Sequence, residues 1–265
     1  MVSSYKNKFS LKNKLCIVLG GSGLIGSETC RAFLEFNANV VCLDLIKPKI
    51  DTSKKFSFYK FDCSNLDLLE ENLEKIYKEA GIPDVFANCS YPRTKNWSDS
   101  SFQKLNLKTL EENIKLNLIS STWISKLIAE KMKKNKVKGS IIHLGSIYGE
   151  KAQNLNIYKG TDMEENAIYP IIKGGIISFT KQMASVYGKN NIRVNTISPG
   201  GIEGNVAGKD SKQEKSFIEN YSYNAPLKRL ARKDEIGSAM VFLASEASSY
   251  ITGTNLLIDG GWTSV

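Results

Sequence analysis

The chain has 265 residues, of which 42% are hydrophobic and 24% charged, and its formal net charge is +9. This composition is ordinary for a globular protein, and the length suits one large α/β domain or two small ones. The first 14 residues are polar without the apolar run of a signal sequence, and no later run approaches a membrane span. We therefore expect a cytoplasmic protein that does not enter a membrane.

The positive charge comes from lysines spread along the chain, with one dense run, KMKKNKVK, at 131–138. Such a run is typical of a solvated helix end and indicates nucleic-acid binding only weakly, so no nucleic-acid partner is expected. The single histidine, His143, lies inside an apolar run and is expected to be buried and hydrogen-bonded, and a metal site is not expected. The cysteines include no CxxC pair and are expected to be reduced core residues; they are Cys16, Cys30, Cys42, Cys63 and Cys89.

Short β-rich runs alternate with helical patterns along the whole chain. Strands are expected near 14–19, 38–45, 56–62, 84–88, 139–146, 192–198 and 255–259, and helices near 24–36, 66–80, 107–134, 167–187 and 234–245. Apolar runs such as CIVL lack period-two alternation, as expected for strands buried on both faces. The pattern predicts an α/β fold with a doubly wound, mostly parallel sheet flanked by helices, in a single domain over 1–265.

Three segments stand outside this alternation. Residues 1–13 form a polar N-terminal extension, and the longest irregular stretches are 149–166 and 200–226. Loops of this length in a compact domain are usually functional lids or disordered segments, and both follow strand ends where open α/β sheets bind ligands. We predict that 149–166 and 200–226 are substrate-side loops and that the second closes over the ligand.

A glycine-rich turn joins the first expected strand to the first expected helix. In LGGSGLIGSE, Gly20, Gly23 and Gly26 are spaced three apart. Glycines at such a turn let the backbone approach a pyrophosphate closely, and the helix N-terminus favours an anion. The position of this turn, after a strand and before a helix, predicts a dinucleotide site.

Asp44 ends the second expected strand, eighteen residues beyond Gly26. A carboxylate at this place can accept hydrogen bonds from an adenosine ribose and would repel a 2′-phosphate, which favours NAD over NADP. A solvated strand-end aspartate is the plainer interpretation, and Lys47 nearby leaves NADP open. Asp62, which ends the third strand, is expected either near the adenine or in a turn or helix-capping role.

Two tyrosine–lysine pairs have the spacing that places side chains on one face of a helix, Tyr91 with Lys95 and Tyr169 with Lys173. In a lysine-rich chain this spacing also arises by chance, so spacing alone does not distinguish the pairs. The order of the surrounding motifs does distinguish them.

With the glycine turn, a Tyr–Lys pair and the ending YITGTNLLIDGG, the chain resembles the short-chain dehydrogenase/reductase family from about residue 12 to the terminus. Other pieces fall in the family's order: Asn117 in IKLNLIS, Ser146 in IIHLGSIYG, and the block IRVNTISPGGI. Only Tyr169 follows the Ser146 strand and leads the next helix, so it is the tyrosine that the resemblance selects. The resemblance implies a Rossmann-like fold and a homodimer or homotetramer.

The resemblance also implies a catalytic tetrad of Asn117, Ser146, Tyr169 and Lys173. Tyrosine has an unperturbed pKa of about 10, so a nearby cation is needed to favour its phenolate at neutral pH. Lys173 would supply that cation, Ser146 would hydrogen-bond the substrate oxygen, and Asn117 would help order a water in a proton relay. Hydride transfer belongs to the nicotinamide.

The same resemblance implies two sets of contacts. The dinucleotide would contact Gly20, Ser22, Gly23, Leu24, Ile25, Asp44, Asp62, Cys63, Asn88, Tyr169, Lys173, Pro199, Gly200 and Ile202. The substrate would contact Tyr91, Arg93, Ser146 and Tyr148.

Three departures from the family pattern limit this transfer. Leu19 stands where the family has a threonine before its first glycine, and the glycine spacing looks more like the branch that modifies sugar nucleotides. The family's Asn-Asn-Ala-Gly reads Ala-Asn-Cys-Ser at 87–90, in which Asn88 keeps the position of a cofactor contact. Ser146 lies 23 residues before Tyr169 where about a dozen is usual, so roughly ten residues are inserted there.

The inserted GEKAQNLNIYKGTDMEEN, together with ANCSYPRTKNW, resembles a smaller branch of flagellin-modification or amino-sugar oxidoreductases, which act in making nonulosonates and other surface sugars. This implies a polar sugar as substrate, phosphorylated or nucleotide-linked. The nearby cations are anion contacts in that interpretation and plain surface charges in the alternative; they are Arg93, Lys95, Lys151 and Lys159.

The leading hypothesis is an NAD(P)-dependent oxidoreductase, NAD preferred, that interconverts a secondary alcohol and a ketone on a sugar or amino-sugar derivative of surface-glycan biosynthesis. A non-catalytic dinucleotide-binding sensor or scaffold remains an alternative because of Leu19 and the altered motif after the fourth strand. A nucleotide-sugar epimerase or dehydratase is a second alternative, favoured by the glycine spacing and disfavoured by the short chain.

Overall fold

The computed structural model of the chain describes residues 4–50, 54–204 and 212–265. Seven strands form one parallel sheet in the order β3-β2-β1-β4-β5-β6-β7. The strands are β1 (Leu15–Leu19), β2 (Asn39–Asp44), β3 (Phe56–Lys60), β4 (Val85–Asn88), β5 (Ser140–Leu144), β6 (Arg193–Pro199) and β7 (Asn255–Ile258). This confirms the predicted Rossmann-like sheet, whose order reverses between β1 and β4, where such sheets bind ligands.

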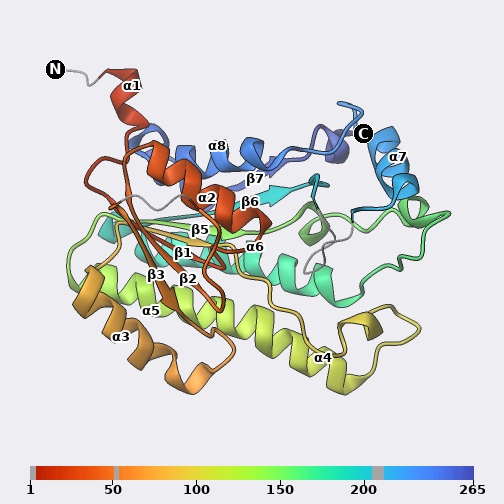
Figure 1. The fold of residues 1–265 in the computed structure, drawn as a ribbon, viewed down its shortest axis with the longest axis horizontal. Helices are drawn as coiled ribbons and strands as arrows, with labels where there is room; N and C mark the ends of the chain where they lie inside the picture. The colour runs from red at the N-terminus through yellow and green to blue at the C-terminus, as the bar shows by residue number, and fades with distance from the viewer. Residues whose placement is uncertain (1–3, 51–53, 205–211) are drawn as a thin grey trace.

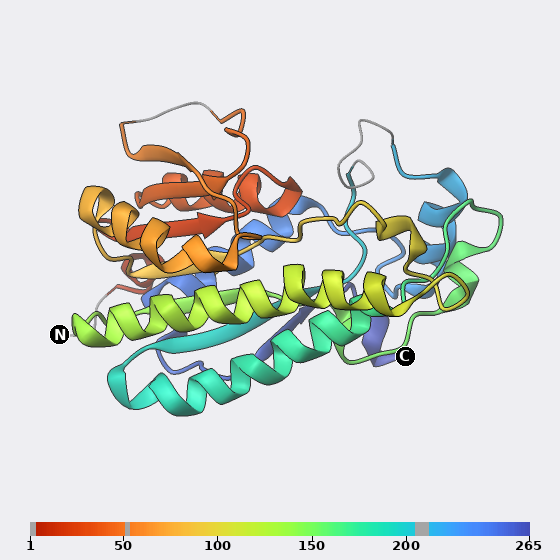
Figure 2. The same cartoon turned by 90° about the horizontal axis from the view of Figure 1, so that it is seen from below.

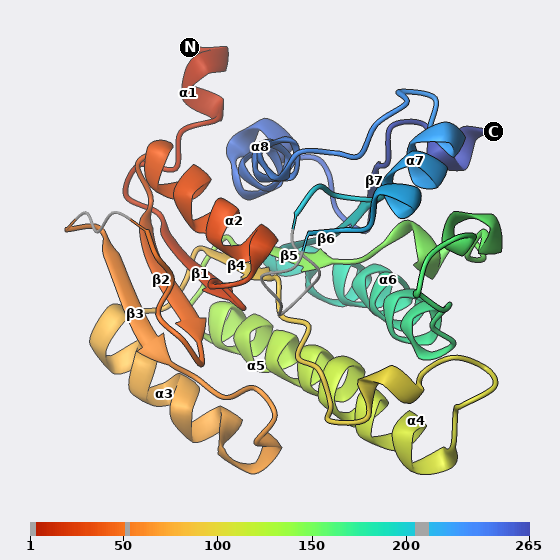
Figure 3. The same cartoon turned by 45° about the vertical axis from the view of Figure 1, so that its right-hand side comes forward.

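Helices cover both faces of the sheet (Figure 1). They are α1 (Tyr5–Lys8), α2 (Leu24–Glu35), α3 (Leu69–Ala80), α4 (Leu107–Ile114), α5 (Ser120–Lys134), α6 (Ile168–Tyr187), α7 (Lys215–Asn224) and α8 (Lys233–Ala244). Figure 3 shows α2 and α8 on one side of the sheet and α3, α5 and α6 on the other. The predicted helices are confirmed, and the long pattern at 107–134 is one run in which a π-helical turn, Lys115–Ile119, joins α4 to α5.

The central strands are buried on both faces. In β1, Ile17 and Leu19 pack in the cluster under α3, α5 and α6, whereas Cys16 and Val18 pack in the cluster under α2 and α8. Because side chains alternate along a strand, a strand between two helical layers buries both sets of side chains and is apolar at most positions. This is the physical reason for the missing period-two alternation in the sequence.

The segments expected to be irregular carry more structure than predicted. Within 1–13, residues 5–8 form the short helix α1 and Leu11 is fully buried. Within 200–226, helix α7 buries Tyr221, and its apolar positions at 217, 218 and 221 have helical spacing. Residues 1–3 and 205–211 of these segments lie outside the described residues.

His143 is buried and hydrogen-bonded, as predicted. One ring nitrogen lies 2.7 Å from Thr180 Oγ1 and the other 2.9 Å from Ser125 Oγ. Burial lowers the pKa of His143 to about 4, so the ring is neutral. All five cysteines are free thiols, and Cys16, Cys30 and Cys42 are buried.

Two features are absent from the part of the chain that the structure describes. In residues 4–50, 54–204 and 212–265, no helix has the length and apolar character needed to cross a bilayer. The same residues contain no group of three or more His, Cys, Asp or Glu side chains arranged to hold a metal ion.

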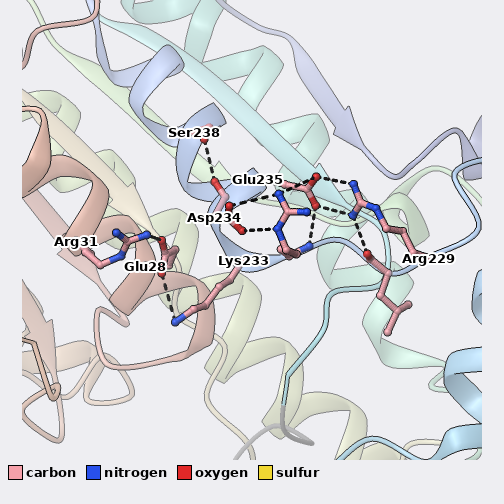
Figure 4. Close-up of polar contacts among 9 residues, drawn as sticks. Glu28, Arg31, Arg229, Lys233, Asp234, Glu235 and Ser238 are labelled. Carbon is pink, nitrogen blue, oxygen red and sulfur yellow. Dashed lines mark hydrogen bonds and ion pairs between the residues drawn. The ribbon is translucent and has the colours of Figure 1, made fainter.

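A buried carboxylate joins α2, the helix that follows the glycine turn, to α8. Glu28 is 2% exposed and pairs with Arg31 on its own helix and with Lys233 Nζ, 3.3 Å away, on α8 (Figure 4). Burial alone would raise the pKa of Glu28, but the two cations outweigh it and the pKa is lowered. The α8 end of this contact is itself fixed, because Glu235 accepts from Arg232 N (2.8 Å) and pairs with Arg229.

Replacing this carboxylate with an amide, Glu28→Gln, should lower the free energy of unfolding at pH 7 by about 1–3 kcal/mol, the range for hydrogen bonds to charged groups. The folded-state pKa lies below the unfolded value, so the contribution is complete above the unfolded pKa and disappears as pH falls through the folded one. Urea unfolding should therefore show a gap between the two proteins that narrows below about pH 4. Glu35→Gln, which removes an exposed partner of the same Arg31, should change stability by less than about 0.5 kcal/mol. Equal losses for both variants would contradict the assignment.

Candidate active site

The predicted site residues follow strands that end at one edge of the sheet. Leu19, at the end of β1, is in register with Leu43 of β2 and with Asn88 of β4, and Leu144 of β5 is in register with Ile197 of β6. Because the strands are parallel, their carboxyl ends share this edge. The segments after them, which carry the glycine turn, Asp44, Ser146 and the start of the 200–226 loop, are therefore neighbours in space.

The backbone of the glycine turn is too closely packed for a side chain at Gly20 or Gly26. Gly20 has φ +73°, and a Cβ there would lie 2.7 Å from the Ser90 backbone. A Cβ at Gly26 would lie 2.0 Å from the Gly20 carbonyl oxygen. Gly23 precedes α2 and has no side chain to cap it, which leaves the first amides of α2 free for an anion. The shape of the turn suits a pyrophosphate, and dinucleotide contacts of Gly20, Ser22, Gly23, Leu24 and Ile25 remain a prediction.

Asp44 is held by backbone amides on both carboxylate oxygens. Oδ2 accepts from Ser22 N (2.9 Å) and Oδ1 accepts from Leu45 N (2.7 Å). The Ser22 hydroxyl in turn donates to the carbonyl of Ile46. Each carboxylate oxygen keeps a lone pair that a ribose hydroxyl could use. The geometry thus fixes the carboxylate beside the glycine turn.

Asp62 has a local structural role in the chain. Its Oδ1 accepts from both the amide (2.9 Å) and the hydroxyl (2.6 Å) of Ser64, which makes the turn that follows β3. Cys63 is half-buried, and burial raises the pKa of its thiol to about 11. The turn role was one of the two expectations for Asp62, and its contact with an adenine remains a prediction, as does that of Cys63.

The altered motif after β4 is internally satisfied. Asn88 Nδ2 donates to Ser121 Oγ (2.8 Å), and Asn88 Oδ1 accepts from the amide (3.1 Å) and the hydroxyl (2.7 Å) of Ser90. Ser90 is the residue whose backbone approaches Gly20. The serine that replaces the family's glycine therefore holds Asn88 in place beside the glycine turn.

The segment after β6 is held from two directions. Gly200 N donates to Ile258 O of β7 (3.0 Å), and Gly201 N donates to the Tyr221 hydroxyl of α7 (2.6 Å). Ile202 then forms a β-bridge with Ala231. The predicted cofactor contacts of Pro199, Gly200 and Ile202 thus lie on a backbone that both β7 and α7 fix.

Lys173 lies under the end of β5 and faces Tyr169. The lysine is 2% exposed, and its Nζ donates to Leu144 O at 2.8 Å. The same nitrogen lies 5.5 Å from the centroid of the Tyr169 ring, one helical turn earlier on α6. Helix α6 begins at Ile168, so Pro170 lies in its first turn, where the missing N–H breaks no helical hydrogen bond.

Burial shifts the pKa values of both Tyr169 and Lys173. Burial raises the pKa of Tyr169, and a hydrogen bond from Ser146 opposes that shift. Burial lowers the pKa of Lys173 to about 8, with a small opposing effect of Cys89. Ser146 is buried, and its Oγ also accepts from Tyr148 N (3.2 Å). The structure therefore brings Ser146, Tyr169 and Lys173 together, and their catalytic roles remain a prediction.

Asn117 lies in the π-helical turn between α4 and α5. It is 4% exposed, and neither its amide nitrogen nor its carbonyl oxygen has a hydrogen-bond partner among the described residues. A buried side-chain amide without partners costs free energy unless water or a ligand satisfies it. Such π turns occur often at functional sites. Sequence reasoning selected Asn117 but not the π turn, for which the residue pattern gives no signal.

Aromatic side chains form one wall beside Tyr169. The Tyr91 ring meets the Tyr169 ring edge to face at 5.2 Å and the Trp97 ring at 5.4 Å. The Arg93 guanidinium lies 5.6 Å over Trp97, and the Lys173 ammonium lies 4.8 Å over Tyr91. Tyr91, which the sequence analysis predicts as a substrate contact, therefore forms a wall edge to face with Tyr169.

Tyr148 is a further predicted substrate contact, and the three lysines that follow are the predicted anion contacts. Tyr148 packs against the apolar cluster of Ile147, Ile157, Tyr221 and Trp262, and burial raises the pKa of its hydroxyl. Lys95 and Lys159 are exposed. Lys151 lines a pocket of about 270 Å³ with Asn224, Trp262 and Val265.

Asn166 was missed by sequence reasoning although it carries a recognisable signal. It stands three residues before Tyr169, and its Oδ1 accepts from Ile168 N (3.0 Å) and Tyr169 N (2.8 Å). An asparagine just before an apolar helix is a standard helix-capping pattern. The cap fixes the backbone of Tyr169 at the first turn of α6.

A protein-family model and several known proteins match this chain over most of its length. A family model described as enoyl-(acyl carrier protein) reductase matches residues 22–263. The chain is 28% identical over 261 residues to the post-translational flagellin modification protein A of Campylobacter coli, covering 95% of this chain and 99% of that protein. It is 27% identical over 284 residues to a ribulose-forming D-arabinitol 2-dehydrogenase of Scheffersomyces stipitis, covering 98% of each.

A solved structure matches over almost the whole chain. The short-chain dehydrogenase of Leptospira borgpetersenii with bound NAD⁺ superimposes with a TM-score of 0.85 at 33% identity. The match covers 99% of this chain and 97% of that one.

Proposed function

The chain belongs to the short-chain dehydrogenase/reductase family of oxidoreductases, and from that premise we propose that it is an NAD-dependent enzyme interconverting a secondary alcohol and a ketone on a sugar or amino-sugar derivative. One observation carries the proposed chemistry. The buried Lys173 ammonium is fixed on the Leu144 carbonyl, beside a Tyr169 whose hydroxyl pairs with Ser146. A tyrosine, a cation and a hydroxyl donor in this arrangement suit proton transfer at an alcohol oxygen.

Each residue of the tetrad has a definite role in the proposal. In alcohol oxidation the Tyr169 phenolate accepts the hydroxyl proton, and in ketone reduction the Tyr169 hydroxyl returns it. Ser146 hydrogen-bonds the same oxygen and orients the carbon that bears the hydride. Lys173 favours the phenolate electrostatically, and Asn117 binds a water that connects Lys173 with solvent. When bound, the nicotinamide supplies or accepts the hydride.

A polyhydroxylated substrate is supported by the site wall and by two relatives. Tyr91, Trp97 and Arg93 offer aromatic faces and a guanidinium, which suit the apolar faces and the oxygens of a sugar. One relative is named for flagellin modification and another for D-arabinitol oxidation. We infer that the substrate is a sugar derivative of surface-glycan biosynthesis.

NAD is the proposed dinucleotide because of Asp44. Its two oxygens are pinned by Ser22 N and Leu45 N, so the carboxylate cannot swing away from a 2′-phosphate. The similar Leptospira dehydrogenase was solved with NAD⁺.

We also infer that the chain assembles into a homodimer or homotetramer. Helices α5 and α6 lie side by side on one face (Figure 2). Trp123 on α5, Ile171 on α6 and Ile119 at the end of the π-helical turn before α5 are each more than 40% accessible. Large apolar side chains grouped in this way are typical of association surfaces.

The proposed mechanism predicts that Tyr169→Phe binds the dinucleotide but loses at least about 100-fold in kcat, because the proton-transfer group is gone. The assay follows reduced nicotinamide with NAD and a panel of free, phosphorylated and nucleotide-linked sugars, sugar alcohols and simple secondary alcohols. Tyr187→Phe is the matched control, since it also removes a tyrosine hydroxyl from α6. The Tyr187 hydroxyl donates to Glu130. Wild-type activity in Tyr169→Phe would refute the mechanism, and dinucleotide binding without turnover on any panel member would favour a sensor.

The proposed cofactor preference predicts that Asp44→Ala tightens NADP binding by on the order of tenfold or more, because it removes like-charge repulsion with the 2′-phosphate. Binding of NAD should weaken in the same variant, since two ribose hydrogen bonds are lost. Fluorescence titration of both dinucleotides measures the two changes. Asp67→Ala, which removes an exposed carboxylate from the same half of the chain, should alter neither. An unchanged NADP affinity in Asp44→Ala would exclude Asp44 as the discriminating residue.

A further inference from the structure

Within the inserted segment 149–166, the side chain of Gln153 bonds the backbone of Asn166, two residues before α6 begins. Gln153 Nε2 donates to Asn166 O at 2.7 Å, and Asn166 N donates to Gln153 Oε1 at 3.2 Å. The side-chain amide therefore satisfies both backbone groups of Asn166, as a neighbouring strand would. A side chain that bonds a donor and an acceptor of one residue fixes its position and its orientation together.

Asn166 in turn fixes the backbone of Tyr169. Its backbone is held by Gln153, and its side-chain oxygen accepts from Ile168 N and Tyr169 N at 3.0 and 2.8 Å. The intervening residue is also fixed, because Ala167 N donates to Ser100 O at 2.8 Å. The first turn of α6 thus depends on Asn166, and the place of Asn166 depends on Gln153.

The amide of Gln153 is itself oriented by Tyr158. The Tyr158 hydroxyl donates to Gln153 Oε1 at 2.8 Å, which leaves Nε2 facing the Asn166 carbonyl. Burial raises the pKa of Tyr158 to about 12, so its hydroxyl remains a donor throughout the physiological range. Three hydrogen bonds therefore determine one rotamer of a half-buried glutamine.

Helix α7 holds Tyr158 from the other side. The Tyr158 ring stacks on Phe217 with centroids 6.4 Å apart and planes at 23°. Asn220 donates to the carbonyls on either side of Tyr158, at 3.4 Å to Ile157 O and 2.8 Å to Lys159 O. The chain of contacts runs from α7 through the insertion to the first turn of α6.

We propose that Gln153 is a positioning residue: its side-chain amide holds Asn166, and through Asn166 it holds the first turn of α6 so that the Tyr169 hydroxyl stays within reach of the substrate oxygen. The inference rests on the proposed function, in which Tyr169 transfers the proton. Gln153 touches neither Tyr169 nor Ser146 in the contacts above, so it acts through Asn166 alone. Small displacements of a reacting group cost large factors in rate, which gives such a residue its effect.

Three variants test the proposal. Gln153→Met keeps the side-chain length but removes every hydrogen bond to Asn166, and it should lower kcat about tenfold while the KM for NADH stays unchanged. Gln153→Glu keeps the acceptor and regains the donor only when its carboxyl is protonated. Asn154→Ala is the control, because Asn154 lies in the same segment. It accepts from Asn156 N and donates to Asn224 of α7, and no hydrogen bond joins its side chain to Asn166 among the described residues.

The decisive readout is the pH dependence of kcat relative to wild type in the ketone-reducing direction. For Gln153→Glu this ratio should rise towards one as pH falls through the pKa of the introduced carboxyl, whereas for Gln153→Met it should stay low and flat. Asn154→Ala should remain within about twofold of wild type at every pH. A flat ratio for Gln153→Glu, or wild-type kcat in Gln153→Met, would overturn the positioning role.

Hydrogen exchange separates failure of this inference from failure of the proposed function. If the wild-type protein turns over no substrate, the proposed function fails, and exchange at the Ile168 and Tyr169 amides then decides the inference. These amides should exchange faster in Gln153→Met than in wild type and at the wild-type rate in Asn154→Ala. Equal rates in all three proteins would show that Gln153 does not hold the first turn of α6.

Discussion

The hydrogen bond from the Lys173 ammonium to the Leu144 carbonyl is the contact on which the rest of the site depends. A buried ammonium is costly unless it is hydrogen-bonded, and the partner here is the last carbonyl of β5. That carbonyl belongs to a strand paired on both sides, so the rigid sheet rather than a loop sets the position of the charge. Tyr169 lies one helical turn before Lys173, and a hydroxyl at the end of the same strand, from Ser146, pairs with it. One strand end therefore organises the cation, the tyrosine and the hydroxyl donor.

The two sides of the site are fixed in different ways. On the side proposed to hold the dinucleotide, the backbone is closely packed: a Cβ added at Gly20 or Gly26 would clash with backbone atoms, and two amides hold Asp44. On the substrate side the constraints are side-chain hydrogen bonds and stacked rings, in which Gln153, Asn166 and Tyr158 link α7 to α6. The first arrangement suits a cofactor common to many relatives. The substrate-side hydrogen bonds lie in the inserted segment. We expect a chain with its own substrate to differ from its relatives in such a segment.

The sequence allowed the sheet and the main helices to be predicted and the residues of the proposed tetrad to be selected, because their signals are local or repeat along the chain. Continuous apolar runs mark strands buried on both faces, and the order of Asn117, Ser146, Tyr169 and Lys173 distinguished one tyrosine–lysine pair from the other. The π turn around Asn117 could not be predicted, since it depends on how α4 and α5 pack rather than on residue type. The edge-to-face contact of Tyr91 with Tyr169 and the hydrogen bonds of Gln153 could not be predicted from the sequence either, because they join residues that are not neighbours in the chain. The cap at Asn166 was a local signal that was overlooked.

The most direct test of the central claim is an absorbance titration of tyrosinate in the protein saturated with NAD, which needs no knowledge of the substrate. Burial raises the pKa of Tyr169 in the protein alone, and the account predicts that the positive nicotinamide of bound NAD together with Lys173 outweighs this effect. One tyrosine should then lose its proton below the free value of about 10. This step should be absent in Tyr169→Phe and move to higher pH in Lys173→Met, because the cation is gone. An early step that persists in Tyr169→Phe, or that stays in place in Lys173→Met, would contradict the pairing of Lys173 with Tyr169 as the basis of the chemistry.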